Sequence, residues 1–374
     1  MAELVVPFFN LTSQQKQIVE DATNNKEWIF IEGPPGSGKT CISLHIVRAL
    51  IGTDIVKPLV LIYNNSLLGY LRTSFEQLGV KDSITINTKD KFFFSLKKQF
   101  DISINNDLPF EEKKKILLTE LLNKKIDLEY SIVILDEIQD FTELEWKFLK
   151  QLSKRFILLG DFDQRIYSAD LQKNTLLQVT NHKILSKIFR FGEMIAKLVQ
   201  VFSKTKKDLV AQVDRKDTIK PIVIDCESID KENNEVSEII KARQNDGGRI
   251  AVISISKDRL STIHKFLTEN LVTHFHAPDP TEFAKYDFST NTTVLITSAS
   301  AKGLEFSTVI VVGFDNSAPA VFGFKKHGGF EENIYVCLSR ATHHLFVLRN
   351  PDTVDEIKKL ESFQETASDE DVWF

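Results

Sequence analysis

Cysteine is scarce in this sequence, and neither sign of charge dominates it. The only three cysteines among 374 residues, Cys41, Cys226 and Cys337, lie far apart in apolar surroundings. This pattern favours buried thiols in a reducing compartment over a disulfide framework or a zinc site. The net charge of −5 leaves no global basic signature, and any nucleic-acid surface must therefore be a local patch.

Long apolar runs are also missing. No run reaches the roughly 20 residues of a transmembrane helix, and the N-terminus lacks the basic and then apolar layout of a signal peptide. We therefore expect a cytoplasmic protein with no membrane partner. The chain has 42% hydrophobic and 26% charged residues, which is ordinary for a globular protein. Its length favours two or three domains.

A glycine-rich segment, Gly33–Thr40, carries the clearest chemical signal. It follows an apolar run at Trp28–Ile31 and precedes helical periodicity at Cys41–Leu50. This context, with Gly-Lys-Thr at its end, predicts a phosphate-binding P-loop, whose glycines aim backbone N–H groups at phosphate oxygens. The alternative is a turn that only connects a strand to a helix. The predicted phosphate-binding residues are Gly33, Pro34, Pro35, Gly36, Ser37, Gly38, Lys39 and Thr40.

The P-loop reading assigns two roles to the end of this segment. The Lys39 ammonium is predicted to reach the terminal phosphates, which makes it catalytic as well as cofactor-binding. The Thr40 hydroxyl is predicted to coordinate Mg²⁺. The cofactors that we expect are therefore ATP and Mg²⁺.

Two acidic motifs follow predicted buried strands. Asp136–Asp140 comes after Ser131–Leu135, and Gly160–Gln164 comes after Arg155–Leu159. The carboxyl ends of parallel strands face the ligand crevice. We expect Asp136 to hold Mg²⁺, Glu137 to polarise the attacking water, and the Gln164 amide to sense the γ-phosphate. The alternatives are a polar loop start and an ordinary loop residue.

Strands alternate with helices along the rest of the chain, which predicts an α/β protein with two parallel sheets. We expect a first domain at 1–180, a second at 181–350, and a C-terminal helix and acidic tail at 351–374. Residues 179–202 carry helical patterning that is interrupted near Phe191. The other expected strands lie at 58–63, 83–87, 221–225, 249–254, 293–296, 308–312 and 345–348.

A Lys- and Phe-rich stretch at about 90–127 predicts a small helical insertion in the first domain, with helical spacing at Phe92–Phe100 and Phe110–Leu122. Its lysine clusters are at 97–98, 113–115 and 124–125. Such clusters are either phosphate contacts or solvated faces, and the residues alone leave both open.

Together these motifs resemble the superfamily 1 helicases of the UvrD/Rep type, and the resemblance covers nearly the whole chain. Further matching segments carry it beyond the P-loop and the two acidic motifs. They are Gln15, Tyr63–Asn65, Gly160–Tyr167, Phe189–Arg190, Lys302–Phe306 and Tyr335–Ala341. The resemblance implies two RecA-like P-loop NTPase domains.

The resemblance also implies roles for single residues. Gln15 would read adenine, Phe189 would stack on it, and Glu305 would meet the ribose. Arg190 and Arg340 would be arginine fingers that complete the catalytic set, although single arginines are commonly surface salt bridges. Tyr63, Asn65 and Tyr167 would contact a single strand.

The chain departs from the family pattern at three places. Ser168–Asp170 stands where the family has a base-stacking aromatic followed by an arginine, and Ala299 replaces a histidine. A stacked base contributes about 1–3 kcal/mol, so we expect a weaker strand grip, or one shifted to Tyr63, Tyr167 and the insertion. Only about forty residues separate the strands ending at Ser254 and starting at Thr293, so this is a short form without the large regulatory insertion of bigger relatives.

The sequence leaves three candidate functions. The first is an ATPase driven by single-stranded nucleic acid, DNA rather than RNA, that acts as a translocase or helicase. The second is a regulatory ATP switch that licenses or recruits a protein partner, such as a nuclease or another DNA-processing or defence factor. The third, a small-molecule kinase, would not need Phe189–Arg190 or Lys302–Phe306. The tail at 369–374 is either a docking segment or a disordered, solubilising end.

Overall fold

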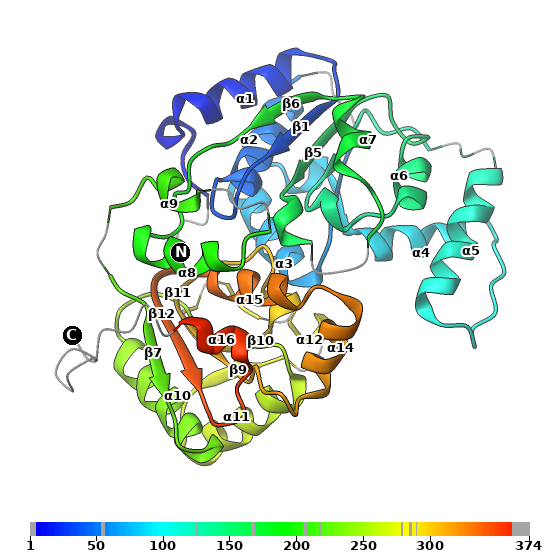
Figure 1. The fold of residues 1–374 in the computed structure, drawn as a ribbon. Helices are drawn as coiled ribbons and strands as arrows, with labels where there is room; N and C mark the ends of the chain where they lie inside the picture. The colour runs from blue at the N-terminus through cyan, green and yellow to red at the C-terminus, as the bar shows by residue number, and fades with distance from the viewer. Residues whose placement is uncertain are drawn as a thin grey trace. The chain divides into compact units, whose positions relative to one another are not determined.

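The structure is a computed structural model. It describes residues 5–53, 57–124, 126, 128–165, 169–204, 208–216, 219–277, 280–283, 286–288 and 290–360. The chain forms two compact units (Figure 1). The first contains the described residues of 5–33, 38–165 and 169–186, and the second contains 34–37 and the described residues from 187 onward.

The first unit is built on a six-stranded sheet in the order β3-β2-β4-β5-β1-β6, and each neighbouring pair runs parallel. Its four central strands are buried along their whole length, as expected for a parallel sheet covered on both faces. The strands are β1 (Ile29–Glu32), β2 (Pro58–Ile62), β3 (Thr85–Thr88), β4 (Ile132–Leu135), β5 (Phe156–Gly160) and β6 (Asn181–Ile184).

Helices cover both faces of this sheet, because successive strand side chains point to opposite sides. Ile29 and Ile31 pack into one core, and Phe30 between them packs into the other. The first core is closed by α1 (Ser13–Asn24), α2 (Lys39–Ile51) and α3 (Asn65–Gln77). The second is closed by α4 (Lys89–Gln99), α5 (Phe110–Asn123), α6 (Glu143–Leu149) and α7 (Lys173–Leu177). Short 3₁₀ turns lie at Phe8–Asn10, Lys81–Ser83, Ile138–Asp140 and Phe162–Gln164.

The expected helical insertion is the pair α4 and α5, which lie side by side (Figure 1). Phe92, Phe93 and Leu96 of α4 belong to the same core as Leu117 and Leu121 of α5. The pair is therefore packed onto the sheet as part of the first unit.

The second unit repeats the architecture, with the strand order β7-β12-β11-β8-β10-β9 and parallel pairing throughout. Two six-stranded parallel sheets with covering helices confirm the α/β fold with two RecA-like units. The strands are β7 (Ile222–Asp225), β8 (Ile250–Ser254), β9 (His274–His276), β10 (Thr293–Thr297), β11 (Phe306–Val312) and β12 (Ala341–Arg349).

Helices α10 (Ile229–Arg243) and α11 (Lys257–Glu269) close the core on one face of this second sheet. Helix α15 (Phe330–Leu338) contacts β11 and β12, and α13 (Ser298–Ala301) contacts β10. The remaining described helices are α8 (Glu193–Val201), α9 (Leu209–Gln212), α12 (Pro280–Phe283), α14 (Pro319–His327) and α16 (Asp355–Lys358).

One secondary-structure prediction is wrong in its first half. Residues 179–202 were expected to be helical, but 181–184 form β6, and α8 begins only at Glu193. Pairing with β1 overrides the local pattern there, and the His182 ring stacks on Phe30 at 5.2 Å. The same pairing keeps residues 181–186 in the first compact unit. The three-part domain division stays a prediction, and the tail beyond 360 lies outside the described residues.

The aromatic core of the first unit yields a stability test. Phe93 is fully buried and meets Phe148 edge-on at 6.0 Å, whereas Phe9 is 75% exposed. We expect Phe93→Ala to lower the free energy of unfolding of the first unit by about 3–5 kcal/mol, because it leaves a cavity. The matched control Phe9→Ala should change it by less than about 0.5 kcal/mol. Chemical denaturation measures both values, and equal effects would contradict the described packing.

Candidate nucleotide site

The order of the strands in the first sheet brings the predicted catalytic segments together. Strands β4, β5 and β1 are adjacent and parallel, so their carboxyl ends meet at one edge. The segments that begin at Asp136, Asp161 and Gly33 leave the sheet from those three ends. In open α/β sheets this edge is where ligands bind.

The P-loop lysine and the predicted adenine reader both lie against the loop. Lys39 begins α2, is largely buried, and donates from Nζ to the Gly33 carbonyl at 2.7 Å. Gln15 Oε1 accepts the Thr12 N–H at 3.0 Å, in the capping box of α1. Gln15 Nε2 would lie 2.6 Å from a Cβ on Gly38, whose φ is +88°. A side chain at position 38 would therefore displace the Gln15 amide.

Residues 34–37, the tip of the loop, group with the second unit. The Gly36 carbonyl accepts the Phe189 N–H at 2.9 Å. A Cβ on Gly36, whose φ is +76°, would lie 2.4 Å from the Arg190 Cβ. Glycine is required here both by its backbone conformation and by the close approach of the chain. The loop tip thus contacts the predicted adenine-stacking residue and the predicted arginine finger.

The two predicted magnesium ligands lie next to each other. Thr40 Oγ1 donates to Asp136 Oδ2 at 3.1 Å. Burial of Asp136 raises the pKa of its carboxyl, the neighbouring Glu137 raises that pKa further, and Lys39 opposes the shift. A hydroxyl beside a carboxylate suits Mg²⁺, which binds through one or two carboxylates together with water and phosphate oxygens.

No cluster of three or more His, Cys, Asp or Glu side chains able to hold a metal ion occurs among the described residues. Mg²⁺ takes a small ligand set from a protein when phosphates complete its coordination. Thr40 and Asp136 would hold the ion, which when bound would neutralise phosphate charge.

Gln139 connects the predicted general base to the next motif. The backbone of Glu137 is left-handed, with φ 55° and ψ 47°. Its Oε2 accepts from Gln139 Nε2 at 2.5 Å, and Gln139 Oε1 accepts the Asp161 N–H at 3.0 Å. Gln139 is completely buried. The sequence analysis included Gln139 in the motif but assigned it no role. The pattern that could have indicated this bridging role is an amide two residues after the predicted base.

Gln164 is held inside its own loop. Its Nε2 donates to Asp161 Oδ2 at 3.0 Å, and Asp161 Oδ1 accepts the Asp163 N–H at 3.2 Å. Arg165 follows, and its Nε donates to the Gln139 carbonyl at 3.0 Å. The structure therefore links the predicted γ-phosphate sensor to the Glu137 segment through Asp161 and Gln139.

In the second unit, two predicted site residues pair with each other. Arg190 Nε donates to Glu305 Oε2 at 3.0 Å, and Arg190 Nη1 donates to the Ser339 carbonyl at 3.1 Å. The predicted arginine finger thus forms an ion pair with the predicted ribose contact.

Arg340, the second predicted finger, is only 1% exposed. Its guanidinium donates to the carbonyls of Val336 at 3.0 Å and Leu304 at 3.3 Å, and to Ser339 Oγ at 2.9 Å. The alternative of a surface salt bridge does not describe this residue. The finger role of Arg340 stays a prediction.

The predicted nucleic-acid contacts follow β2. Asn64 caps α3 by accepting the Leu67 N–H at 2.8 Å, and Asn65 is the first residue of that helix. Tyr63 is half-buried, with Lys89 Nζ 5.6 Å from its ring centroid. Because β2 neighbours β4, these residues leave the sheet at the same edge as Asp136. Tyr167 lies outside the described residues.

The fold and the site define a P-loop NTPase with two RecA-like units. The family model of an AAA domain matches residues 15–170, which include Gln15, the P-loop and both acidic motifs. The matched residues are those of a P-loop domain, and the resemblance of the chain to superfamily 1 helicases agrees with this match. Among curated proteins, none matches this chain.

Three solved helicase structures are similar to the chain. The arterivirus nonstructural protein 10 helicase is 15% identical (TM-score 0.44; 89% of this chain and 62% of that one covered). The PRRSV helicase is also 15% identical (TM-score 0.42; 94% and 57%). The C-terminal domain of a possible DNA helicase from Lactobacillus plantarum is 16% identical (TM-score 0.35; 45% and 91%).

The chain spans 62% and 57% of the two viral helicases it matches. Within the described ranges, no helix is long and apolar enough to cross a bilayer.

The close approach at Gly160 tests the role of Gln139. A Cβ at this position would lie 2.7 Å from Gln139 Oε1 and 2.7 Å from Ile138 Cγ2. We expect Gly160→Ala to push Gln139 off Glu137 and to lower kcat for ATP by up to about 100-fold, since small misplacements of catalytic groups can cost that much. The KM for ATP should change little.

Gly323→Ala is the matched control, because a Cβ on Gly323 meets nothing within 4 Å. Steady-state ATPase kinetics compare the two variants. A Gly160→Ala protein as active as Gly323→Ala would show that the Gln139 bridge has no part in hydrolysis.

Proposed function

We propose that this protein is an ATPase stimulated by single-stranded nucleic acid, DNA rather than RNA, that acts as a UvrD/Rep-like translocase or helicase. The observation that carries the proposal is the polar chain at the edge of the first sheet. Thr40 contacts Asp136, and Gln139 bridges the Glu137 carboxylate to the Asp161 backbone. Three strand-end motifs thereby form one connected group.

Hydrolysis by this group needs little covalent chemistry from the protein, because phosphoryl transfer depends mainly on positioning and on charge neutralisation. Glu137 would orient and deprotonate the attacking water, and Gln139 would hold the Glu137 carboxylate. Lys39 would exchange the Gly33 carbonyl for phosphate oxygens. Mg²⁺, held by Thr40 and Asp136, would neutralise the charge of the phosphates when bound.

The second unit would contribute Phe189, Arg190, Glu305 and Arg340. Arg190 and Glu305 form an ion pair. The predicted nucleotide partners are the phosphates for Arg190 and the ribose for Glu305. In the proposed cycle this ion pair opens when ATP binds. Arg190 then contacts the phosphates, and Glu305 contacts the ribose. Repeated exchange with each ATP would move a strand bound to both units.

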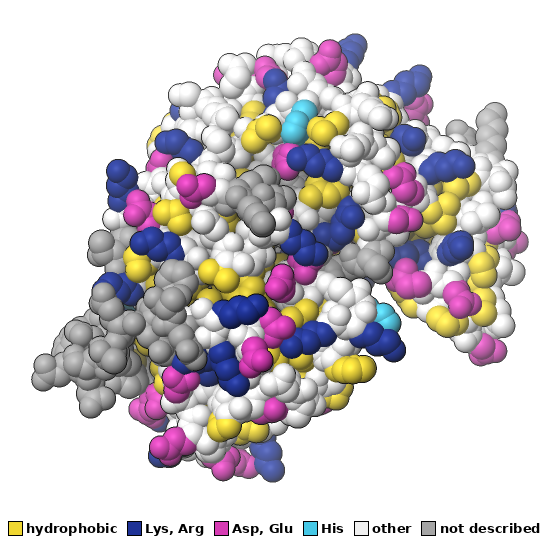
Figure 2. All heavy atoms as spheres, in the orientation of Figure 1, with side chains coloured by type: hydrophobic (Ala, Val, Ile, Leu, Met, Phe, Trp, Pro, Cys, Tyr) yellow, Lys and Arg dark blue, Asp and Glu magenta, His cyan; other side chains and the backbone are white. Residues whose placement is uncertain are grey.

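Strand binding would rest on a local surface. Figure 2 shows Lys and Arg side chains interspersed with Asp and Glu over the visible face. Tyr63 and Asn65 at the end of β2, and the less buried lysines of the clusters in α4 and α5, are the proposed contacts in the first unit. These lysines are Lys97, Lys98, Lys113 and Lys115. Stacking on Tyr63 would supply sequence-tolerant affinity.

A second candidate function is the regulatory ATP switch that recruits a partner such as a nuclease. One observation favours it. Asp170 falls in the segment where the family has a stacking aromatic and an arginine, and its Oδ1 accepts the Glu143 N–H at 2.8 Å. Asp170 is therefore tied to the start of α6. A switch would hydrolyse ATP without responding to nucleic acid.

The two candidates differ in a single assay. We expect single-stranded DNA at low salt, where such contacts are strongest, to raise the ATPase rate several-fold above its basal value and above the rate with duplex DNA or RNA. Lys39→Ala should abolish turnover with every nucleic acid, and chelation of Mg²⁺ should do the same. A rate that no DNA or RNA changes would favour the switch and overturn the motor.

The arginine finger has its own test. We expect Arg190→Ala to lower hydrolysis by about 10³–10⁵-fold, as loss of such arginines does in other NTPases, while ATP binding is retained. Lys187→Ala is the control. Lys187 lies three residues before Arg190, and the change removes an exposed ion pair with Asp214. Measuring ATP affinity and single-turnover hydrolysis separates the two effects. Unchanged hydrolysis in Arg190→Ala would remove Arg190 from the catalytic set.

A further inference from the structure

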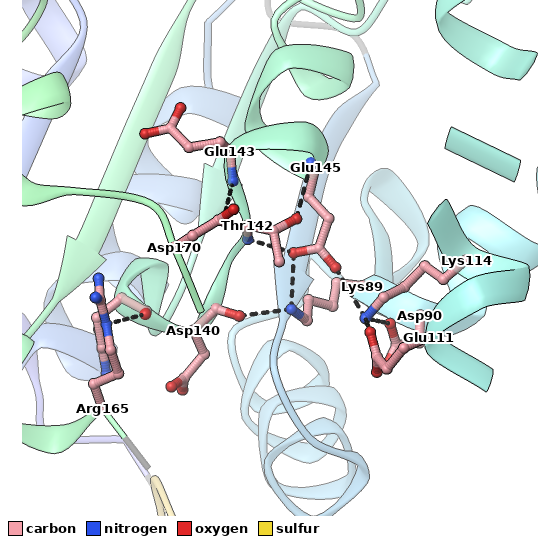
Figure 3. A network of polar contacts seen from close by, with 11 residues as sticks. Lys89, Asp90, Glu111, Lys114, Asp140, Thr142, Glu143, Glu145, Arg165 and Asp170 are labelled. Carbon is pink, nitrogen blue, oxygen red and sulfur yellow. Dashed lines mark hydrogen bonds and ion pairs between the residues drawn. The ribbon is translucent and has the colours of Figure 1, made fainter. Parts of the chain in front are cut away.

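A buried group of charges lies behind the hydrolytic motif in the first unit (Figure 3). At its centre Lys89 Nζ contacts Glu145 Oε2 at 2.9 Å. The Lys89 side chain is 4% exposed, and that of Glu145 is fully buried. Lys89 is the first residue of α4, and Glu145 lies in α6. The pair therefore joins one helix of the insertion to the helix that follows the Asp136–Asp140 motif.

Toward the insertion, Glu145 Oε1 contacts Lys114 Nζ of α5 at 3.2 Å. Lys114 also contacts Asp90 at 3.3 Å and Glu111 at 3.1 Å. Burial alone would lower the pKa of Lys114, but the three carboxylates outweigh it and raise that pKa. Burial would likewise raise the pKa of Glu145, and the two lysines hold it below its usual value. Lys114 and Glu145 are therefore both charged at neutral pH.

Toward the hydrolytic motif, Lys89 Nζ donates to the Asp140 carbonyl at 2.6 Å. Asp140 ends the 3₁₀ turn that carries Gln139, the partner of Glu137. Arg165 holds the Gln139 carbonyl at 3.0 Å. Figure 3 shows Lys89 and Arg165 on opposite sides of Asp140. The segment from Glu137 to Asp140 is thus fixed by two cations.

Toward the proposed strand contact, the same ammonium faces two aromatic rings. It lies 4.8 Å from the Phe141 centroid and 5.6 Å from the Tyr63 centroid. Both distances are within the range of cation–π attraction. One buried charge therefore contacts the proposed base-stacking residue, the insertion and the backbone next to the general base.

Stability alone does not require such a group. Buried ion pairs recover their desolvation cost only in part, and well-packed apolar replacements are often as stable or more so. A role in fixing one arrangement among alternatives is better attested for buried charges. Here the arrangement that is fixed is that of the segment carrying Glu137 and Gln139.

We propose that Lys89 is a positioning residue that, with Glu145 and Lys114, transmits strand occupancy at Tyr63 and movement of α4 and α5 to the Glu137–Asp140 segment. This inference rests on the proposed function. A base stacked on Tyr63 would displace its ring relative to the ammonium, and the Lys89–Asp140 contact would pass the shift to Gln139 and Glu137. The group would thus make ATP hydrolysis depend on the nucleic acid.

The test uses the charge-neutral double variant Lys89→Met/Glu145→Gln in the full chain. The new glutamine keeps an acceptor for the Thr142 N–H, which Glu145 Oε2 now accepts at 2.8 Å. The matched control is Lys81→Met/Glu76→Gln, which applies the same substitutions to an exposed ion pair of the same unit. Thermal unfolding verifies that each variant is folded.

Two readouts separate positioning from a merely structural role. We expect the stimulation of ATPase by single-stranded DNA to fall about fivefold or more in Lys89→Met/Glu145→Gln, the lower end of typical coupling between sites, while the KM for ATP is unchanged. We also expect faster amide hydrogen exchange in a peptide covering 137–142. The control should match the unmodified protein in both. Stimulation and exchange equal to the control would overturn the proposal.

A second variant, Lys114→Met, decides the matter if the double variant does not fold or if the proposed function fails. Lys114→Met changes only the far end of the group, in α5, and we expect it too to speed exchange at 137–142. If no nucleic acid stimulates the unmodified protein but Lys114→Met speeds this exchange, the proposed function is lost and the positioning group stands. If Lys114→Met leaves the exchange unchanged, the positioning role is excluded.

Discussion

The parallel pairing of β4, β5 and β1 is the constraint on which the rest of the site depends. It places three segments that are distant in sequence at one edge of the sheet, where their side chains bond to one another. Thr40 contacts Asp136, and Gln139 spans from Glu137 to Asp161. A loss of register in any of these strands would separate the phosphate-binding loop from the groups that act on the phosphate.

The cations of the site share one property. Lys39, Arg190, Arg340 and Lys89 each donate to an acceptor supplied by the protein itself. Burying an unpaired charge is expensive, so these internal acceptors allow the side chains to be desolvated in place. The first three are the cations predicted to contact the nucleotide. Lys89 differs because it has no predicted nucleotide contact, and its acceptors are the Asp140 carbonyl and the Glu145 carboxylate.

The sequence predicted the P-loop, the two acidic motifs and the two parallel sheets, because glycine spacing and buried strands leave short-range patterns. It missed what depends on distant pairing. Residues 181–184 look helical in isolation and become β6 beside β1. Lys114, in a run of three lysines, was open to a reading as part of a solvated face, yet its side chain is 8% exposed and is held by Glu145. The local pattern carries no sign of that carboxylate, 31 positions away.

The central claim is that the carboxyl edge of the first sheet binds and hydrolyses ATP. A crystal structure with Mg²⁺ and a non-hydrolysable ATP analogue tests it most directly. The account predicts Lys39 Nζ on the terminal phosphates, the metal ion between Thr40 and Asp136, and the Glu137 carboxylate facing the γ-phosphate. A nucleotide bound away from residues 33–40, or with Glu137 turned from the γ-phosphate, would contradict it.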